Sequence, residues 1–129
     1  MIYNHLARDW INWKYRTMYK LIILFEHPID EQEFQENWQK FMSLAEKLPR
    51  LKREVVSRVQ DTIHSPGENH ITRIHELLFD SRDALETAMG SPAGQVAGQF
   101  LQAFTLGRVT LLIAEHMEAY EREFQSKTG

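Results

Sequence analysis

The densest apolar run in the chain is Met18–Phe25, in which the last five residues are all apolar and many are branched or aromatic. This pattern predicts a β-strand. Successive side chains of a strand point to opposite faces, so Leu21, Ile23 and Phe25 share one face while Ile22 and Leu24 share the other. Both faces of this strand therefore require burial, and one layer of helices can cover only one of them.

A helical pattern follows the strand. Asp30 with Glu33 three positions on has the spacing of a helix N-cap of the capping-box type. Apolar residues then recur at steps of four and three until Pro49 and predict a stripe that faces the sheet. The stripe consists of Phe34, Trp38, Phe41, Ala45 and Leu48.

Two further strands are predicted on either side of a loop that contains Ser65-Pro66-Gly67. In residues 50–59, Leu51, Val55 and Val59 share a face and Lys52, Glu54 and Arg58 mark the other, which is typical of a solvated edge strand. Residues 70–79 carry apolar side chains on both faces, which is typical of a central strand. One face holds Ile71, Arg73, His75, Leu77 and Phe79, and the other holds Thr72, Ile74, Glu76 and Leu78.

Two helices, a strand and a short C-terminal helix are expected in the last third. Ser81 begins a short helix with Leu85, Ala88 and Met89 on one face, and Gly90 suits a left-handed C-terminal position. Ser91-Pro92 begins a second helix, with a stripe formed by Val96, Phe100 and Phe104. In this helix Gly94 and Gly98 suggest close approach to a neighbour. Residues 107–114 form the last strand, and Met117, Tyr120 and Phe124 suggest a short C-terminal helix.

The predicted order β-α-β-β-α-β is that of a ferredoxin-like α+β domain with an antiparallel sheet. Right-handed crossovers place both helical connections on one face of the sheet. The first, third and last strands nevertheless carry apolar residues on both faces, so a monomer would expose a large apolar surface. We therefore expect a homodimer in which two sheets pack face to face as a dimeric α+β barrel.

The leading residues 1–17 mix charged residues with Leu6, Trp10 and Trp13, whose spacing fits a short amphipathic helix. We treat 1–17 as an N-terminal extension and 18–129 as the single domain. One hypothesis is that the natural chain begins at Met18. The alternative is a docking helix that presents Trp10 and Trp13 to a partner.

Composition narrows the class of protein. The chain has 129 residues, 43% of them hydrophobic. Its formal net charge is −3 and both signs are interspersed, so no electrostatic field of one sign attracts nucleic acid or anionic lipid. It has no cysteine, which excludes disulfides and thiolate chemistry and fits a reducing cytoplasm. No stretch approaches the roughly 20 apolar residues of a membrane-spanning helix. We expect a cytoplasmic protein that binds neither nucleic acid nor membranes.

Five short motifs between about Met18 and Glu115 resemble those of the EthD family, named after a protein of ether-degradation clusters. They are Tyr19–Phe25 followed by Pro28, Phe34-x-x-x-Trp38, Leu48-Pro49-x-Leu51, Glu76-Leu77-x-Phe79-Asp80 and Ser91-Pro92-x-Gly94-Gln95. The resemblance implies a dimeric α+β barrel with a ligand pocket. Related barrels include small monooxygenases, polyketide cyclases, isomerases and haem-handling proteins, so the reaction stays open.

The chain departs from this family in its first helix. Many relatives carry a histidine about four residues after the aromatic residue of that helix, where this chain has Phe41 and Met42. If that imidazole is an acid–base group in relatives, it cannot act here. The departure weakens the expectation of an enzyme.

Candidate chemistry is concentrated in the third strand, because Arg73, His75 and Glu76 are costly to bury unless paired. In one interpretation, Arg73 and His75 bind a carbonyl-bearing ligand and His75 moves protons. In the other they form hydrogen bonds or ion pairs across the dimer interface, which is the more common use of such groups. Glu76, on the opposite face, is expected to pair with a neighbouring strand or helix.

The predicted ligand pocket therefore consists of Trp38, Phe41, Arg73 and His75, with His27 and His75 as candidate bases. His27 follows the first strand, where a loop residue can lean over a pocket. The six histidines form no metal-binding motif and no phosphate loop or nucleophile motif is present, so we expect no metal and no cofactor.

Two functions remain open. One is an accessory protein that binds an apolar or aromatic metabolite beside an oxidative pathway, and the other is a cofactor-independent isomerase, cyclase or monooxygenase.

Overall fold

The computed structural model describes residues 16–68 and 70–125. Its elements are β1 (Arg16–Glu26), α2 (Glu31–Ala45), β2 (Arg53–Arg58), β3 (Ile71–Phe79), α3 (Arg82–Gly90), α4 (Pro92–Thr105), β4 (Val109–Glu118) and α5 (Glu121–Gln125). The predicted order is confirmed, with α3 and α4 together forming the second helical connection. Residues 1–15, with the proposed docking helix around Trp10 and Trp13, lie outside the described residues.

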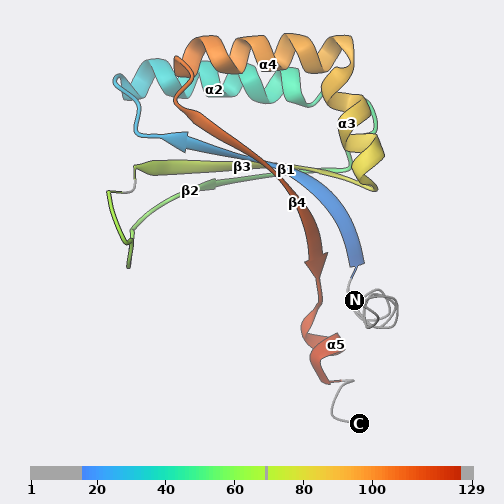
Figure 1. The fold of residues 1–129 in the computed structure, drawn as a ribbon. Coiled ribbons are helices and arrows are strands. Elements are labelled where there is room, and N and C mark those ends of the chain that lie inside the picture. The colour runs from blue at the N-terminus through green and yellow to red at the C-terminus, as the bar shows by residue number, and fades with distance from the viewer. Residues whose placement is uncertain (1–15, 69, 126–129) are drawn as a thin grey trace.

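The four strands form one antiparallel sheet in the order β2-β3-β1-β4. The predicted edge position of β2 and central position of β3 are both confirmed. Figure 1 shows α2, α3 and α4 on the same side of the sheet, while β1 and β4 bend away from the helices toward α5. The fold is therefore α+β and ferredoxin-like, with one sheet face that no helix of the described residues covers.

β1 begins earlier in the chain, and β4 ends later, than the apolar pattern predicts. β1 begins at Arg16, two residues before Met18, and the pairing of Arg16 with Glu118 extends β4 to that residue. Met117 consequently lies in β4 and not in the C-terminal helix. The extra residue pairs between β1 and β4 are held by backbone hydrogen bonds, which any side chain permits. The hydrophobic pattern therefore does not reveal them.

The core lies between the sheet and the helices. Leu21, Ile23 and Phe25 of β1 share a face, as predicted, and the structure places that face on this side, where all three are buried. The predicted stripe from Phe34 to Leu48 is buried in full, although α2 ends at Ala45 and Leu48 lies after it, and β3 contributes Leu77 and Phe79. Phe25 meets the Phe34 ring edge-on at a centroid distance of 5.3 Å, which is a favourable geometry for aromatic pairs.

The helix starts follow the predicted caps. The side chain of Asp30 accepts a hydrogen bond from the backbone N–H of Glu33, and Ser81 and Ser91 cap α3 and α4 in the same way. A Cβ at Gly94 would collide with backbone carbonyls at the end of α3, so the predicted close approach is confirmed there. It is wrong for Gly98, which has open space around it.

The helix-end prediction for Gly90 is also wrong, because the left-handed positions among the described helix ends are Leu106 and Gly107, after α4. The fully buried line of α4 consists of Ala97, Leu101 and Thr105. Of the predicted stripe, Phe100 and Phe104 are partly buried and pack against the core, whereas Val96 is 53% exposed. Small residues permit α4 to pack closely here, and tertiary packing of this kind overrides a pattern of large apolar residues.

The open face of the sheet carries apolar residues on three strands. Ile22 lies opposite Leu112 of β4, and Leu24 lies opposite Ile74 of β3. Leu112 is 46% exposed. Glu76 pairs on this face with Lys20 of β1 at 2.5 Å, in agreement with its predicted structural role.

The two edge strands are joined across this open face. Arg53 of β2 donates to Glu118 of β4 at 2.7 Å, although two strands separate them in the sheet order. The sheet must curl for these side chains to meet. The open face is therefore concave at this end, as expected for half of a barrel.

Candidate functional site

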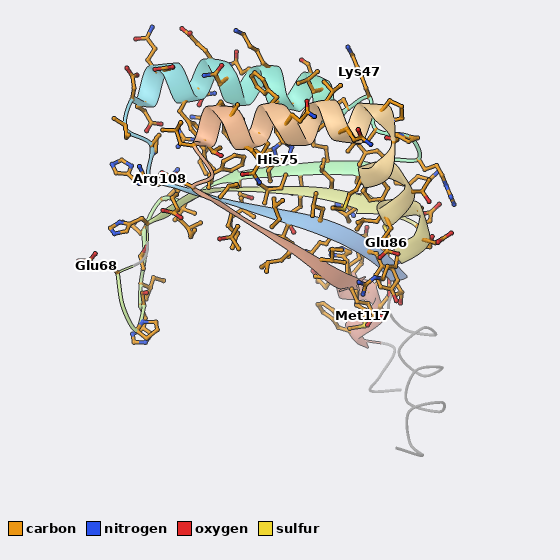
Figure 2. All side chains as sticks on the ribbon, turned by 45° about the horizontal axis from the view of Figure 1, so that its top comes forward. Lys47, Glu68, His75, Glu86, Arg108 and Met117 are labelled. Atoms are coloured by element: carbon orange, nitrogen blue, oxygen red, sulfur yellow. The ribbon has the colours of Figure 1, made fainter. Side chains whose placement is uncertain are left out.

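A chain of polar side chains crosses the interior from α2 to β2. The indole N–H of Trp38 donates to Nδ1 of His75 at 3.1 Å, and Nε2 of His75 lies 2.7 Å from Oε2 of Glu54. Because an indole nitrogen only donates, Nδ1 of His75 must accept and Nε2 must carry the proton given to Glu54. Figure 2 shows His75 between the sheet and the helices.

The chain continues to the surface through a second carboxyl group. The carboxyl group of Glu46, the C-cap residue of α2, acts on that of Glu54. Burial, together with this neighbouring carboxyl group, raises the pKa of Glu54 to about 8. Burial lowers the pKa of His75 to about 4, against the attraction of Glu46. Both shifts favour the uncharged form of the group at neutral pH.

The position of Glu54 differs from its predicted exposure on the outer face of β2. Glu54 lies opposite Leu77 and Val56 opposite His75, so both turn toward the helix side. Val55 faces the open side, opposite Glu76. The β2–β3 register sets these faces, and on a short edge strand the polar pattern alone does not.

Arg73 forms a second buried polar centre near the start of α2. Its guanidinium forms an ion pair with Glu31 and lies 4.6 Å from the ring centroid of Phe34 and 5.4 Å from that of Trp38. Only 7% of Arg73 is exposed. Its Nε atom is buried without a hydrogen-bond partner in the described part of the structure. Cation–π contacts and the ion pair offset the cost of burying this charge.

The four predicted pocket residues are thus brought together, but as a packed cluster. Trp38 is 1% exposed, Phe41 stacks edge-on against His75 at 5.3 Å, and His75 is fully buried. None of the four lines either of the two clefts described below. Their role as ligand contacts, and that of His75 as a base, stay predictions.

A cleft of about 280 Å³ opens where β1 ends, between the start of α2 and the end of α4. Its apolar lining includes Phe34 and Phe104, whose ring centroids lie 5.5 Å apart. Its polar lining includes the predicted base, His27, together with Glu26, Asp30, Glu33, Asn37 and Arg108. Of the predicted site residues, His27 is the one that contacts this cleft.

Arg108 supports the loop that carries His27. Its guanidinium donates to the backbone carbonyl of His27 at 3.1 Å and lies 3.7 Å from the carboxylate of Glu26. Arg108 is labelled at this end of the sheet in Figure 2. Sequence reasoning did not identify Arg108 or Phe104 as cleft residues. Gly107 was predicted to begin the last strand, but it forms with Leu106 a left-handed turn before β4, which starts at Val109.

A second, more open groove lies along α4 and the edge of β4, lined largely by apolar surface and glutamine side chains that include Gln95, Gln99 and Gln102. Among residues 16–68 and 70–125, no group of three or more histidine, aspartate or glutamate side chains is arranged to hold a metal ion. No helix in the same two ranges combines the length and apolarity needed to cross a membrane.

Comparison with known proteins identifies similar chains. No family model matches the sequence. An uncharacterized 11.0 kDa protein in the thcB-thcC intergenic region of Rhodococcus erythropolis is 28% identical over 99 residues, which cover 76% of this chain and 94% of that protein.

Solved structures extend this comparison. A dimeric protein of unknown function and ferredoxin-like fold from Bacteroides fragilis has a TM-score of 0.55 at 21% identity and covers 77% of this chain and 96% of its own. SnoaB, a cofactor-independent oxygenase from Streptomyces nogalater, has a TM-score of 0.52 at 12% identity and covers 81% of this chain and 93% of its own. At these identities the likeness concerns the fold alone.

The crystal structure of an EthD family protein from Bacillus halodurans is more similar. It is 33% identical, with a TM-score of 0.69, over 78% of this chain and 99% of that protein. The resemblance drawn from the sequence motifs is confirmed, and the chain belongs to the ethyl tert-butyl ether degradation (EthD) family.

Proposed function

We propose that this protein is a cytoplasmic homodimer that binds a small apolar or aromatic metabolite, as an accessory to an oxidative degradation pathway. The observation that carries the proposal is the cleft at the end of β1, where Phe34 and Phe104 present aromatic surface beside the polar groups of His27 and Arg108. An apolar lining with a few polar groups is typical of small-molecule sites. Its volume of about 280 Å³ suits a ligand of one or two rings.

The homodimer is supported by the open face of the sheet. Ile22, Leu24 and Leu112 form apolar surface there, and the curl that joins Arg53 to Glu118 gives this face the shape of half a barrel. A second copy would bury this surface against its own equivalent, as expected for a two-fold interface. Similar structures of the same fold are described as dimeric.

A second candidate is a cofactor-independent isomerase, cyclase or monooxygenase. The observation that favours it is the exposed imidazole of His27 at the same cleft, where it could accept a proton from a phenolic or keto substrate. His75 is less suited to this role, because it is fully buried and both of its ring nitrogens are hydrogen-bonded.

Binding can be tested with 2-naphthol as a fluorescent aromatic probe. We expect saturable binding of one probe per chain and at least a tenfold weaker affinity in Phe104→Ala, because part of the aromatic surface is lost. Val96→Ala, on the exposed side of the same helix, is the matched control and should bind like the wild type. Circular dichroism checks that both variants fold.

Equal affinities in Phe104→Ala and Val96→Ala would exclude this cleft as the probe site. Arg108→Ala provides a second variant that leaves the aromatic lining intact. It should also weaken binding, because the carbonyl of His27 loses its hydrogen-bond donor. The absence of saturable binding in the wild-type protein would overturn the proposal.

A further inference from the structure

The buried guanidinium of Arg73 has more hydrogen-bond donors than the surrounding structure satisfies. Arg73 is 7% exposed. Its Nη2 donates to Oε1 of Glu31, and its Nη1 donates to the hydroxyl of Thr72 at 3.3 Å. Its Nε is buried and has no acceptor among the described residues. Because water cannot satisfy a buried donor, such a gap points to an acceptor that this arrangement lacks.

The gap lies on the side of the guanidinium that recognises carboxylates. The N–H groups of Nε and Nη2 are parallel and match the two oxygens of one carboxylate. Glu31 fills half of this pair, with Oε1 on Nη2, and leaves Nε without a partner. A carboxylate that took the place of Glu31 and used both oxygens would fill both donors.

The charge around Arg73 is also incompletely balanced. In the sheet Arg73 lies opposite Phe25 of β1 and opposite Arg58 of β2. Directly opposite residues share a face with Cβ atoms about 5 Å apart, and like charges in such a pair destabilise a sheet. Arg58 is exposed and takes part in none of the ion pairs found between described residues. Two arginines therefore share the single carboxylate of Glu31.

We propose that Arg73 and Arg58 form a binding site for the carboxylate group of a small organic acid, and that Glu31 occupies this site until the ligand displaces it. Arg73 holds both oxygens of the ligand through Nε and Nη2. Arg58 supplies a second positive charge from the solvent side. Glu31 itself shows that the position in front of Arg73 admits a carboxylate.

The exchange of one carboxylate for another costs little. The side chain of Glu31 is 60% exposed, whereas that of Arg73 is 8% exposed, so Glu31 reaches the guanidinium from the solvent. A displaced Glu31 returns to water, which offsets most of the lost ion pair. The charge of Arg73 stays compensated throughout, so no step leaves a buried cation without a partner.

Arg73 is held in position independently of Glu31. Its guanidinium lies 4.6 Å from the ring centroid of Phe34 and 5.4 Å from that of Trp38, and both rings are buried. A flat cation supported by aromatic faces keeps its orientation while its counter-ion changes. Such preorganisation reduces the entropy cost of binding.

The proposed site is separate from the cleft at the end of β1. Arg73, Arg58 and Glu31 do not line that cleft. The inference therefore does not rest on the proposed function, and the two are tested with different probes.

A fluorine NMR titration with 4-fluorobenzoate tests the site in the full-length chain, and 4-fluorobenzamide is a neutral ligand of similar shape. We expect saturable binding of the acid and at least tenfold weaker binding of the amide, because the amide has no charge to offer Arg73. Phe104→Ala, which alters the cleft, should bind the acid like the wild type.

Three variants test the proposed roles. Glu31→Gln should raise the affinity for 4-fluorobenzoate at least threefold, because the competing carboxylate is removed. Arg58→Gln should lower it at least threefold. Arg73→Lys keeps the charge without the paired donors and should lower it at least tenfold. Glu36→Gln, which removes a negative charge from an exposed position on the same helix, is the matched control and should leave the affinity unchanged.

The increase in Glu31→Gln is the result that a purely structural ion pair would not produce. Glu31 and Arg58 are exposed, so their variants keep the test decisive if Arg73→Lys does not fold. No saturable binding of the acid, equal binding of acid and amide, or equal affinities in Glu31→Gln and Glu36→Gln would overturn the proposal. Loss of binding in Phe104→Ala would place the acid in the cleft and would overturn it as well. None of these results would alter the outcome of the 2-naphthol titration.

Discussion

The indole N–H of Trp38 donates to Nδ1 of His75 at 3.1 Å and thereby joins α2 to the central strand β3 inside the core. This bond determines which nitrogen of His75 carries the proton and directs that proton to Glu54. A residue of the predicted helical stripe thus has a polar role in addition to its packing role.

Replacement of Trp38 by Phe should destabilise the fold by about 1–3 kcal/mol beyond the loss of packing, because Nδ1 of His75 loses its buried donor. Urea unfolding measures the change. In a His75→Leu background the same replacement should cost less, since no acceptor is left unpaired. Equal costs in the two backgrounds would show that the hydrogen bond contributes nothing.

Stability should fall as the pH rises from 6.5 to 8.5. Burial and Glu46 raise the pKa of Glu54 from 4.5 to about 8, so its stabilisation is complete below pH 4.5 and is lost as the pH approaches 8. Burial lowers the pKa of His75 from 6.5 to about 4, so its stabilisation is complete above pH 6.5 and is lost as the pH falls toward 4. Of these two groups, only Glu54 contributes a slope above pH 6.5.

We expect this slope to amount to about 1–2 kcal/mol of unfolding free energy between pH 6.5 and 8.5, as measured by denaturant titration at each pH. Glu54→Gln should flatten this alkaline limb and leave the acid limb of His75 in place. A wild-type free energy that is constant over this interval would contradict the prediction.

Introduction of a charge on the open sheet face should dissociate the proposed dimer. Leu112→Glu would bury a carboxylate opposite its equivalent surface, whereas Val96→Glu introduces the same charge at an exposed position on α4. Light scattering should report about twice the 15.2 kDa chain mass for the wild type and Val96→Glu, and a monomer for Leu112→Glu. A monomeric, soluble wild type would refute the face-to-face packing.

The enzyme alternative makes its own prediction about histidine. If His27 is a base, His27→Ala should reduce the turnover of a phenolic or keto substrate about 100-fold, the lower end of what general base catalysis contributes. The pH profile of the residual activity should lose its lower limb. His75→Ala serves as the comparison, and unchanged turnover in both variants would exclude both proposed bases.

Local signals in the sequence were sufficient for most of the fold. Asp30, Ser81 and Ser91 predicted the helix starts, since each cap depends on bonds within a few residues. Alternation predicted which residues of β1 and of β3 share a face, and the structure decided which of the two faces meets the helices. Arg73 and His75 were likewise expected to lie on the same face, because side chains two positions apart on one strand point the same way.

The site was less predictable, because its contacts join distant segments. Phe104 and Arg108 reach the cleft beside His27 only through the return of the chain after α4. In α4, Phe100 and Phe104 pack against the core as predicted, but Val96 is exposed, because close packing and not residue size decides which line is fully buried.

The sequence by itself determined that β1 needs cover on both faces, since apolar side chains in alternation cannot all face one helical layer. Only the tertiary structure decided that Glu54 turns inward, because the β2–β3 register sets the face of an edge-strand residue and that register is a long-range pairing. The meeting of Glu54 with Glu46 and His75 depends on this register. A pattern of polar and apolar residues contains no information about it.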